Sequence, residues 1–309
     1  MSKEVNIIKL PNSVQSFLSY LHMKNKSENT IKGYNSDLKV FFRFIKQHLN
    51  KKVLSDNILK QLKLEDLYGF MSYLDEDRSQ NETKNSPYAK ARKVATLKSY
   101  WKYIYKKLKL VDENIAEELD NIDLPKTQPR YLTLEESIKL LGAVNKKSIN
   151  FQRDYCIITL FLHTGMRLSE LESMRFDSIK GDILTIIGKG NKERTVYLNE
   201  TCLKAIADYL MTRDNYSIQD GRMFNIKKKA IENIVKNNIV KAGIENAESY
   251  SCHKLRHTAS MLMYKHGDVG IAELKDILGH TNISTTNIYA HADNDTLRKA
   301  VKNNPLNNL

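Results

Sequence analysis

Glycine, proline and cysteine are scarce in this chain of 309 residues, which holds 12, 5 and 3 of them. So few glycines and prolines argue against a loop-rich or repeat architecture. The three cysteines, Cys156, Cys202 and Cys252, are odd in number and widely spaced, so neither a disulfide framework nor a zinc site is predicted. No segment reaches the roughly 20 apolar residues that a membrane span requires. We therefore expect a cytoplasmic protein without membrane contact.

Negative charge is in deficit along the whole chain, which has a net charge of +13. Residues 1–125 hold 22 basic and 16 acidic side chains, and residues 126–309 hold 27 and 20. An excess in both halves favours a polyanionic partner that contacts both of them. A solvated basic surface is the alternative interpretation.

The N-terminal part carries apolar residues at helical spacing. Helices are predicted over residues 12–23, 27–44 and 64–74, with Thr30 as the N-cap of the second helix. A polar segment with two prolines, residues 120–130, is typical of an extended linker. This half is predicted to be entirely helical.

The second half is predicted to mix helices with one hairpin. Thr133 and Glu136 have the capping-box spacing that starts a helix, and Gly165 is expected to end a helix just before Arg167. Two strands are predicted around the turn GKGNKE, over residues 182–187 and 194–198. The predicted fold is therefore mainly α with a small β-sheet, in two domains of residues 1–125 and 126–309 that meet near Lys126.

Residues 84–109 hold nine lysines and arginines and no acidic residue. An apolar stripe at spacings of three and four is formed by Val94, Leu97, Trp101, Ile104 and Leu108. A helix with one apolar and one cationic face can pack on its domain and meet phosphates with its other side. We expect DNA contact from four lysines off the stripe, Lys90, Lys98, Lys102 and Lys106. A solvated surface helix is the alternative, although like charges four residues apart repel one another.

Six residues of the second half form a set that suits phosphoryl transfer onto a tyrosine: Arg167, Lys189, His253, Arg256, His280 and Tyr289. Attack on a phosphodiester builds negative charge on its nonbridging oxygens, which the two arginines could clamp and the two histidines could bind by hydrogen bonds. The tyrosine would be the nucleophile, and the lysine would protonate the leaving sugar hydroxyl. A phosphotyrosine conserves the bond energy, so we expect no metal ion and no nucleotide cofactor.

Each of these residues also has an ordinary structural interpretation. Arg167 could pair with Glu170 on the same turn, His280 could cap a helix, and Lys189 could be a turn residue. A lone tyrosine in a helix is usually a packing residue. The prediction therefore depends on the combination and order of all six.

Four motifs, TGMRLSEL, GKGNKERTVYL, HKLRHT and LGHTNISTTNIYAH, together resemble the tyrosine recombinase or phage integrase family, and most of all its Xer-type branch. Residues 27–45, SENTIKGYNSDLKVFFRFI, resemble the core-binding domain of that family. The resemblance implies that the six residues named above are catalytic and that Glu170 supports the active site. Lys192 lies in the same turn as Lys189 and is the alternative choice for the catalytic lysine.

The resemblance further implies a site-specific recombinase that clamps duplex DNA at a short inverted repeat. Four protomers, or protomers of two paired recombinases, would exchange strands on two sites through a 3′-phosphotyrosyl link at Tyr289 and a Holliday junction. The residues after Tyr289 would dock on a neighbouring protomer, and no arm-binding domain is expected before Asn12. The biological task could be chromosome dimer resolution, DNA integration and excision, or inversion. Two alternatives stay open: a relaxing topoisomerase with the same chemistry, and a non-catalytic or accessory DNA-binding protein with a recombinase-like fold.

Overall fold

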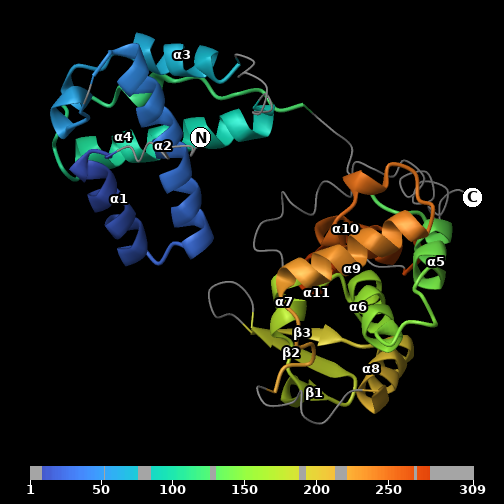
Figure 1. The fold of residues 1–309 in the computed structure, drawn as a ribbon. Helices are drawn as coiled ribbons and strands as arrows, with labels where there is room; N and C mark the ends of the chain where they lie inside the picture. The colour runs from blue at the N-terminus through green and yellow to red at the C-terminus, as the bar shows by residue number, and fades with distance from the viewer. Residues whose placement is uncertain are drawn as a thin grey trace, which may run out of the picture. The chain divides into compact units, whose positions relative to one another are not determined.

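The computed structural model describes residues 9–51, 53–75, 85–125, 130–187, 193–212, 221–267 and 270–278. The chain divides into two compact units, Met1–Thr127 and Gln128–Leu309, which are described separately (Figure 1). Helices dominate both units, and the second also contains a three-stranded sheet, so the predicted mainly α fold with a small sheet is confirmed. In the part of the chain that the structure describes, no helix combines the length and the apolar character needed to cross a membrane.

The first unit is built from helices around one aromatic-rich core. Its elements are α1 (Asn12–Met23), α2 (Glu28–His48), the 3₁₀ helix η1 (Asp56–Lys60), α3 (Leu64–Tyr73), α4 (Pro87–Lys106) and the 3₁₀ helix η3 (Ile115–Glu118). Phe41 and Trp101 are fully buried in this core and pack edge to face. The prediction of Thr30 as the N-cap of α2 is wrong: the Ser27 hydroxyl accepts a hydrogen bond from the Thr30 backbone N–H, so the helix begins one turn earlier.

Helix α4 contains most of the basic segment. It begins after Ser86, whose hydroxyl caps the Ala89 N–H, and has Pro87 at its first position. The predicted apolar stripe is buried except for Leu108, which is exposed because the helix ends at Lys106. The stripe therefore faces the core over the length of the helix and not beyond it.

Asp37 of α2 neutralises part of the charge of α4. Its carboxylate is 3% exposed and accepts hydrogen bonds from Arg92 and Thr96, with the Lys93 ammonium 4.0 Å away. A buried carboxylate requires such partners because its desolvation is costly. Two of the nine basic residues of the segment are thus part of the packing between α2 and α4.

The second unit surrounds the buried helix α6. Its elements are α5 (Leu134–Gly142), α6 (Phe151–Thr164), α7 (Leu168–Ser173), η4 (Phe176–Ser178), β1 (Ile179–Lys180), β2 (Ile183–Ile187), β3 (Glu193–Tyr197), α8 (Glu200–Thr212), α9 (Lys228–Lys241), η6 (Ala247–Ser249), α10 (Cys252–His266) and α11 (Ile271–Leu278). Helices α5, α8, α9 and α10 all pack against α6 (Figure 1). The predicted capping box of α5 is confirmed, since Thr133 and Glu136 each accept a hydrogen bond from the other's backbone N–H.

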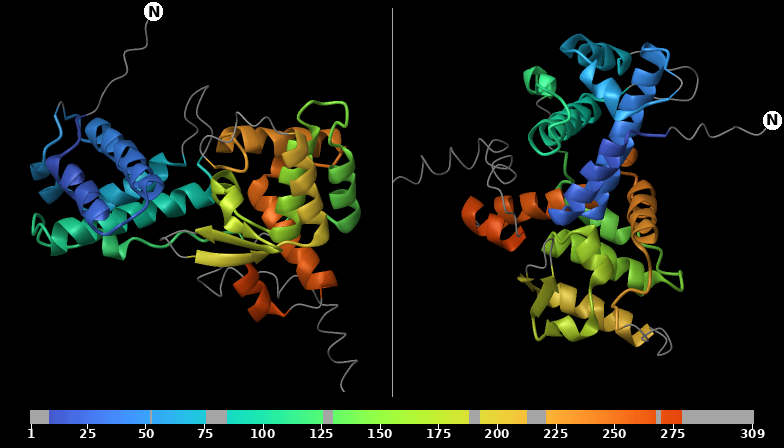
Figure 2. Two further views of the ribbon diagram at one scale, coloured as in Figure 1. Left: turned by 90° about the horizontal axis from the view of Figure 1, so that it is seen from below. Right: turned by 90° about the vertical axis from the view of Figure 1, so that its left-hand side faces the viewer.

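The sheet lies at the edge of this unit and has the order β1-β2-β3, with both pairs antiparallel (Figure 2). The predicted hairpin is confirmed, with Leu184 opposite Val196 and Ile186 opposite Arg194. Leu184, Ile186 and Val196 are buried against the helices. Strand β1 was not predicted, because two residues are too few to show a period of two.

All three cysteines are buried and none forms a disulfide. Burial raises the pKa of Cys202 and Cys252 to about 12, and the pKa of Cys156 still further. Each thiol is therefore held protonated inside the second unit.

Candidate active site

Three of the six predicted catalytic residues belong to the described part of the chain. Arg167 immediately precedes α7, and His253 and Arg256 lie in the first turns of α10. Lys189, His280 and Tyr289 lie outside the described residues. The geometry of the site is therefore built from the two arginines, one histidine and the groups that hold them.

Arg167 is positioned by a sharp change of direction between two helices. Helix α6 ends at Thr164, and Gly165 takes the left-handed conformation with φ of 60° that commonly ends a helix. The predicted helix end at Gly165 is thus confirmed; Arg167 follows as the N-cap residue of α7, and its side chain is 38% exposed. Its backbone N–H donates to Glu170 Oε2 at 2.7 Å and its Nη1 donates to Glu170 Oε1 at 2.8 Å.

Arg256 is almost completely buried, with 4% of its surface exposed. Its Nη1 donates to the Gly165 carbonyl oxygen at 2.6 Å, and its Nη2 donates to the Leu278 carbonyl oxygen at 2.7 Å. The Glu170 carboxylate lies 4.0 Å from Nη1. One guanidinium group thus joins the loop before α7 to the end of α11.

Glu170 is the carboxylate around which these arginines gather. It is 2% exposed and also receives hydrogen bonds from Arg194 of β3, at 2.8 Å from Nη2 and 3.3 Å from Nε. Burial opposes its ionisation, but the hydrogen bonds from Arg194 and Arg167 outweigh burial and lower the pKa of Glu170 below its ordinary value. The ordinary structural interpretation of Arg167, an ion pair with Glu170, is therefore also present in the site.

His253 lies beside this cluster and contacts a second histidine. Its Nε2 atom is 3.0 Å from Nε2 of His257, one helical turn further along α10. Burial of the ring lowers the pKa of His253, and the nearby cations Arg256 and Lys254 lower it further. The imidazole is therefore neutral at pH 7 and can donate or accept a hydrogen bond.

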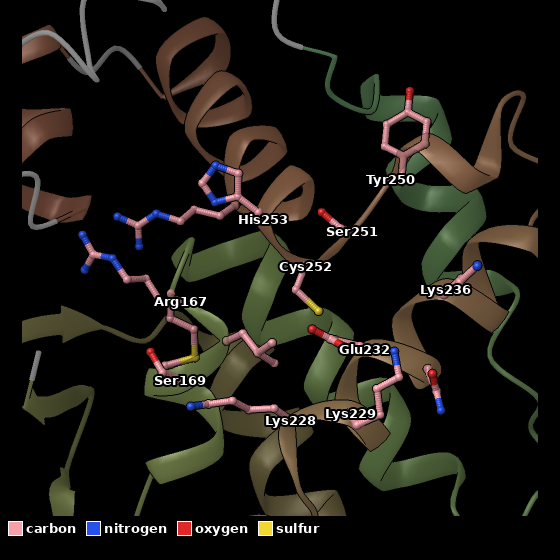
Figure 3. Close-up of a pocket in the computed structure, with 14 residues that line it drawn as sticks. Arg167, Ser169, Lys228, Lys229, Glu232, Lys236, Tyr250, Ser251, Cys252 and His253 are labelled. Atoms are coloured by element: carbon pink, nitrogen blue, oxygen red, sulfur yellow. Dashed lines mark hydrogen bonds and ion pairs between the residues drawn. The ribbon is translucent and has the colours of Figure 1, made fainter. Parts of the chain in front are cut away.

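A cavity of about 520 Å³ opens between α7, α9 and α10 and contains the three predicted residues (Figure 3). Its described lining includes one acidic side chain, Glu232, and five cationic ones, Arg167, Arg256, Lys228, Lys229 and Lys236. Figure 3 shows Arg167 and His253 on one side and Lys229 and Lys236 on the other, while the Lys228 ammonium points toward α7, where it pairs with Glu172 at 3.4 Å. Such a concentration of fixed cations suits a ligand that carries several phosphates.

The predictions missed both the lysines of α9 and Arg194. The run Lys227–Lys229 was visible in the sequence, but its helix gave no sign of facing the arginines. Arg194 lies inside the motif GKGNKERTVYL, but only the two lysines of that motif were considered as candidates for the active site.

Among the residues that the structure describes, no three histidine, cysteine, aspartate or glutamate side chains gather as a metal site.

The predicted DNA-contacting lysines of α4 differ in their surroundings. Lys90 forms an ion pair with Asp75, and the Lys98 ammonium donates to the Asn121 side chain at 3.2 Å. Lys102 and Lys106 are exposed. Lys90 thus has an acidic partner, whereas the ion pairs found within the described residues include neither Lys102 nor Lys106.

Comparisons with known proteins agree with the geometry. The profile of the phage integrase family matches residues 130–296, and that of the phage integrase N-terminal SAM-like domain matches residues 14–108. The chain belongs to the phage integrase family. It is a tyrosine recombinase of the Xer type, an enzyme that recombines DNA at specific sites by cleaving and rejoining it.

Two curated relatives and two solved structures illustrate the likeness. The tyrosine recombinase XerC of Caldanaerobacter subterraneus subsp. tengcongensis is 44% identical, over 97% of this chain and 88% of the relative. That of Staphylococcus aureus (strain JH9) is 32% identical, over 94% and 95%. A post-cleavage complex of XerH with palindromic difH substrate has a TM-score of 0.73 at 20% identity and covers 98% of this chain and 99% of that one. A lambda integrase tetramer bound to a Holliday junction has a TM-score of 0.64 at 13% identity and covers 88% and 77%; at these identities the two structures show the fold.

Proposed function

We propose that the cavity between α7, α9 and α10 binds the scissile phosphate of DNA. The observation that carries the proposal is the meeting of Arg167, Arg256 and His253 at one cationic cavity, with Glu170 holding both arginines. Guanidinium groups fixed before the substrate arrives stabilise charge that develops in the transition state without a further cost of reorganisation. His253 adds a hydrogen bond to the same phosphate.

The remaining catalytic roles are assigned to Tyr289, Lys189 and His280. Tyr289 attacks the phosphate and forms a 3′-phosphotyrosyl link, while Lys189 protonates the leaving 5′-oxygen and His280 hydrogen-bonds to the phosphate. The released 5′-hydroxyl of one strand then attacks the phosphotyrosyl link of the partner strand. The reaction needs neither a metal ion nor a nucleotide, because the phosphotyrosine conserves the energy of the broken bond. The motifs that carry these three residues, and the match of the family profile across them, support the assignment.

The substrate in this proposal is duplex DNA with a short inverted repeat, and the active assembly is a tetramer on two such sites that passes through a Holliday junction. The solved complex of lambda integrase, a tetramer bound to a Holliday junction, supports this assembly by analogy. Residues 1–125 form the core-binding domain and residues 126–309 the catalytic domain, which agrees with the two profile matches. Because the substrate is DNA, we place the protein in the cytoplasm.

DNA phosphates are also bound away from the scissile bond. On α4 the contacts come from Lys102 and Lys106, and from Lys98 and Lys90 once their present partners, Asn121 and Asp75, are displaced or shared. On α9, Lys236 extends the cationic surface from the arginines along the DNA, and Lys228 and Lys229 add to it once their ion pairs with Glu172 and Glu232 are displaced or shared. Contacts of this kind give affinity and position without reading the sequence.

The proposal is tested by recovering covalent protein–DNA adducts from cells that express the wild type or Tyr289→Phe, followed by sequencing of the attached DNA. We expect adducts from the wild type alone, concentrated on one short inverted repeat. The purified Tyr289→Phe protein should bind that repeat with nearly unchanged affinity, because only a hydroxyl is lost.

Two further results would contradict the proposal. Adducts that persist in Tyr289→Phe would show that another residue is the nucleophile. If neither protein forms adducts, even on a nicked duplex that prevents religation, the non-catalytic DNA-binding interpretation would take its place.

A further inference from the structure

We propose that Arg194 is a positioning residue that joins three parts of the active site, namely Arg167, the β2–β3 hairpin and the end of α11. The inference rests on the proposed roles of Arg167, Lys189 and His280. It assigns to Arg194 no contact with DNA. Its effect on the reaction passes through Glu170 and through the backbone of α11.

The first connection consists of two hydrogen bonds from the Arg194 guanidinium to the Glu170 carboxylate. Arg194 Nη2 lies 2.8 Å from Oε2 and Arg194 Nε lies 3.3 Å from Oε1, while the same carboxylate receives the side chain and the backbone N–H of Arg167. Two parallel hydrogen bonds from a guanidinium fix the plane of a carboxylate as well as its place. The orientation of Arg167 therefore depends on Arg194 through a carboxylate that is 2% exposed.

The second connection reaches the end of α11. Arg194 Nη1 donates to the Ile277 carbonyl oxygen at 2.6 Å, and Arg256 Nη2 donates to the carbonyl oxygen of the next residue, Leu278, at 2.7 Å. The last carbonyl groups of a helix have no hydrogen-bond donor within the helix. At the end of α11 two arginines supply the missing donors. His280 follows Leu278 by two residues in the sequence, so the Cα atoms of the two residues can be at most about 7 Å apart.

The third connection comes from the position of Arg194 in its strand. It is the second residue of β3, opposite Ile186, and shares the inward face of the sheet with Val196. Residues 188–192, which include Lys189, join β2 to β3 directly before it. The side chain is 12% exposed, and its hydrogen bonds to Glu170 and Ile277 hold the start of β3 against α7 and α11.

These connections predict that Arg194 acts on the rate of cleavage and not on DNA affinity. A displacement of about 1 Å in a catalytic group can cost on the order of 100-fold in rate. DNA affinity comes mainly from phosphate contacts along the surface, which Arg194 does not supply because its side chain is enclosed. Loss of folding alone would reduce both quantities together.

The experiment uses the full chain with Arg194→Met and Arg194→Lys. The substrate is the inverted-repeat duplex recovered with the adducts, nicked so that cleavage is irreversible. We expect Arg194→Met to lower the single-turnover rate of adduct formation on the order of 100-fold while DNA affinity stays within about twofold. Arg194→Lys should recover only part of the rate, because an ammonium cannot reproduce two parallel hydrogen bonds. Added guanidinium or methylguanidinium ion should partly restore Arg194→Met, which a purely structural defect would not show.

Arg153→Met is the matched control, since Arg153 also pairs with an acidic residue, Asp154, but lies in the first turn of α6 and does not line the cavity. An unchanged rate in Arg194→Met beside an active wild type would overturn the inference and leave the proposed function intact. A fall in rate with an equal fall in DNA affinity, and no rescue by guanidinium, would also overturn it. If the wild type forms no adduct, the proposed function fails and the inference fails with it.

Discussion

Arg256 Nη1 donates to the main-chain oxygen of Gly165 at 2.6 Å, across 91 residues of sequence. Gly165 can offer its oxygen in this direction because its φ is 60°, a conformation that side chains with a Cβ atom rarely adopt. The residue that ends α6 thus sets the place of an arginine on α10. Two elements of the site are joined by backbone geometry and not only by charge.

Gly165→Ala should therefore disturb both stability and catalysis. An added Cβ would lie 2.9 Å from Leu278 Cδ2, and the left-handed conformation alone costs roughly 1–2 kcal/mol for alanine. We expect a lower free energy of unfolding by at least that amount and slower adduct formation, measured by urea denaturation and by the nicked-substrate assay. Gly142→Ala is the control, because nothing lies within 4 Å of its added Cβ and alanine favours the helix. Equal effects of the two changes would contradict the role given to Gly165.

The ionisation of His253 gives a prediction on pH. Burial, Arg256 and Lys254 lower the pKa of His253 in the folded protein. As the pH falls, the unfolded chain therefore protonates this histidine before the folded protein does. The free energy of unfolding should consequently fall as the pH drops below about 6.5, the ordinary histidine pKa, toward the folded value. NMR titration of the ring, assigned with His253→Gln, should give a pKa below 6.5.

Removal of Lys254, one of the cations that lower the pKa of His253, tests this explanation of the shift. Lys254→Met should move the pKa of His253 upward, because a repelling charge is lost. Lys265→Met, at the other end of α10, should leave it unchanged. A wild-type value at or above 6.5 would refute the account of the electrostatics.

The lysines of α9 can be compared along a single helix. Lys236 lines the cavity, whereas Lys241 is exposed at the helix end and does not. Lys236→Gln should reduce the slope of log affinity against log salt by about 0.9 if one phosphate contact is lost. Lys241→Gln should leave the slope as it is. Equal slopes for the two variants would mean that DNA does not follow this face of α9.

The basic face of α4 can be tested in the same way. Lys102→Gln combined with Lys106→Gln should lower the salt slope by up to about 1.8, one unit of 0.9 for each contact. Lys90→Gln should change it less, because Asp75 already neutralises that ammonium. An unchanged slope in the variant that lacks both Lys102 and Lys106 would show that this face of α4 points to solvent and not to DNA.

Asp37 offers a prediction on the first unit alone. Removal of a buried carboxylate leaves its cationic partners uncompensated, so Asp37→Ala should destabilise this unit by about 3 kcal/mol. Fluorescence of Trp101, the single tryptophan and fully buried here, reports its unfolding during urea denaturation. The exposed Asp112 provides the control variant Asp112→Ala. A change below about 1 kcal/mol for Asp37→Ala would show that Arg92 and Lys93 find other partners.

Local patterns in the sequence predicted most of the elements. The period of the apolar residues located the helices, and turn residues located the hairpin and the bend at Gly165. The two local errors, Thr30 and Leu108, both concern helix ends, where a shift of one turn hardly alters the apolar pattern. Motif order then predicted that Arg167, His253 and Arg256 meet, and the structure places all three at one cavity.

Contacts between distant segments could not be predicted in this way. A helical period shows which face of α9 is polar but not that this face borders the cavity of α7 and α10. Arg194 carries three contacts that span 24 to 83 residues of sequence, and no local signal distinguishes it from a surface arginine on a strand. Asp37 likewise meets Arg92 only after α2 and α4 have packed.

The burial of Cys156, Cys202 and Cys252 makes the native protein a poor target for thiol reagents, which attack the thiolate at an accessible sulfur. A cysteine introduced on the surface would therefore react far faster than the three natural ones. Fluorophores could be attached at chosen points, one in each unit, without first removing any native residue. The distance between the two units could then be measured by energy transfer with and without DNA.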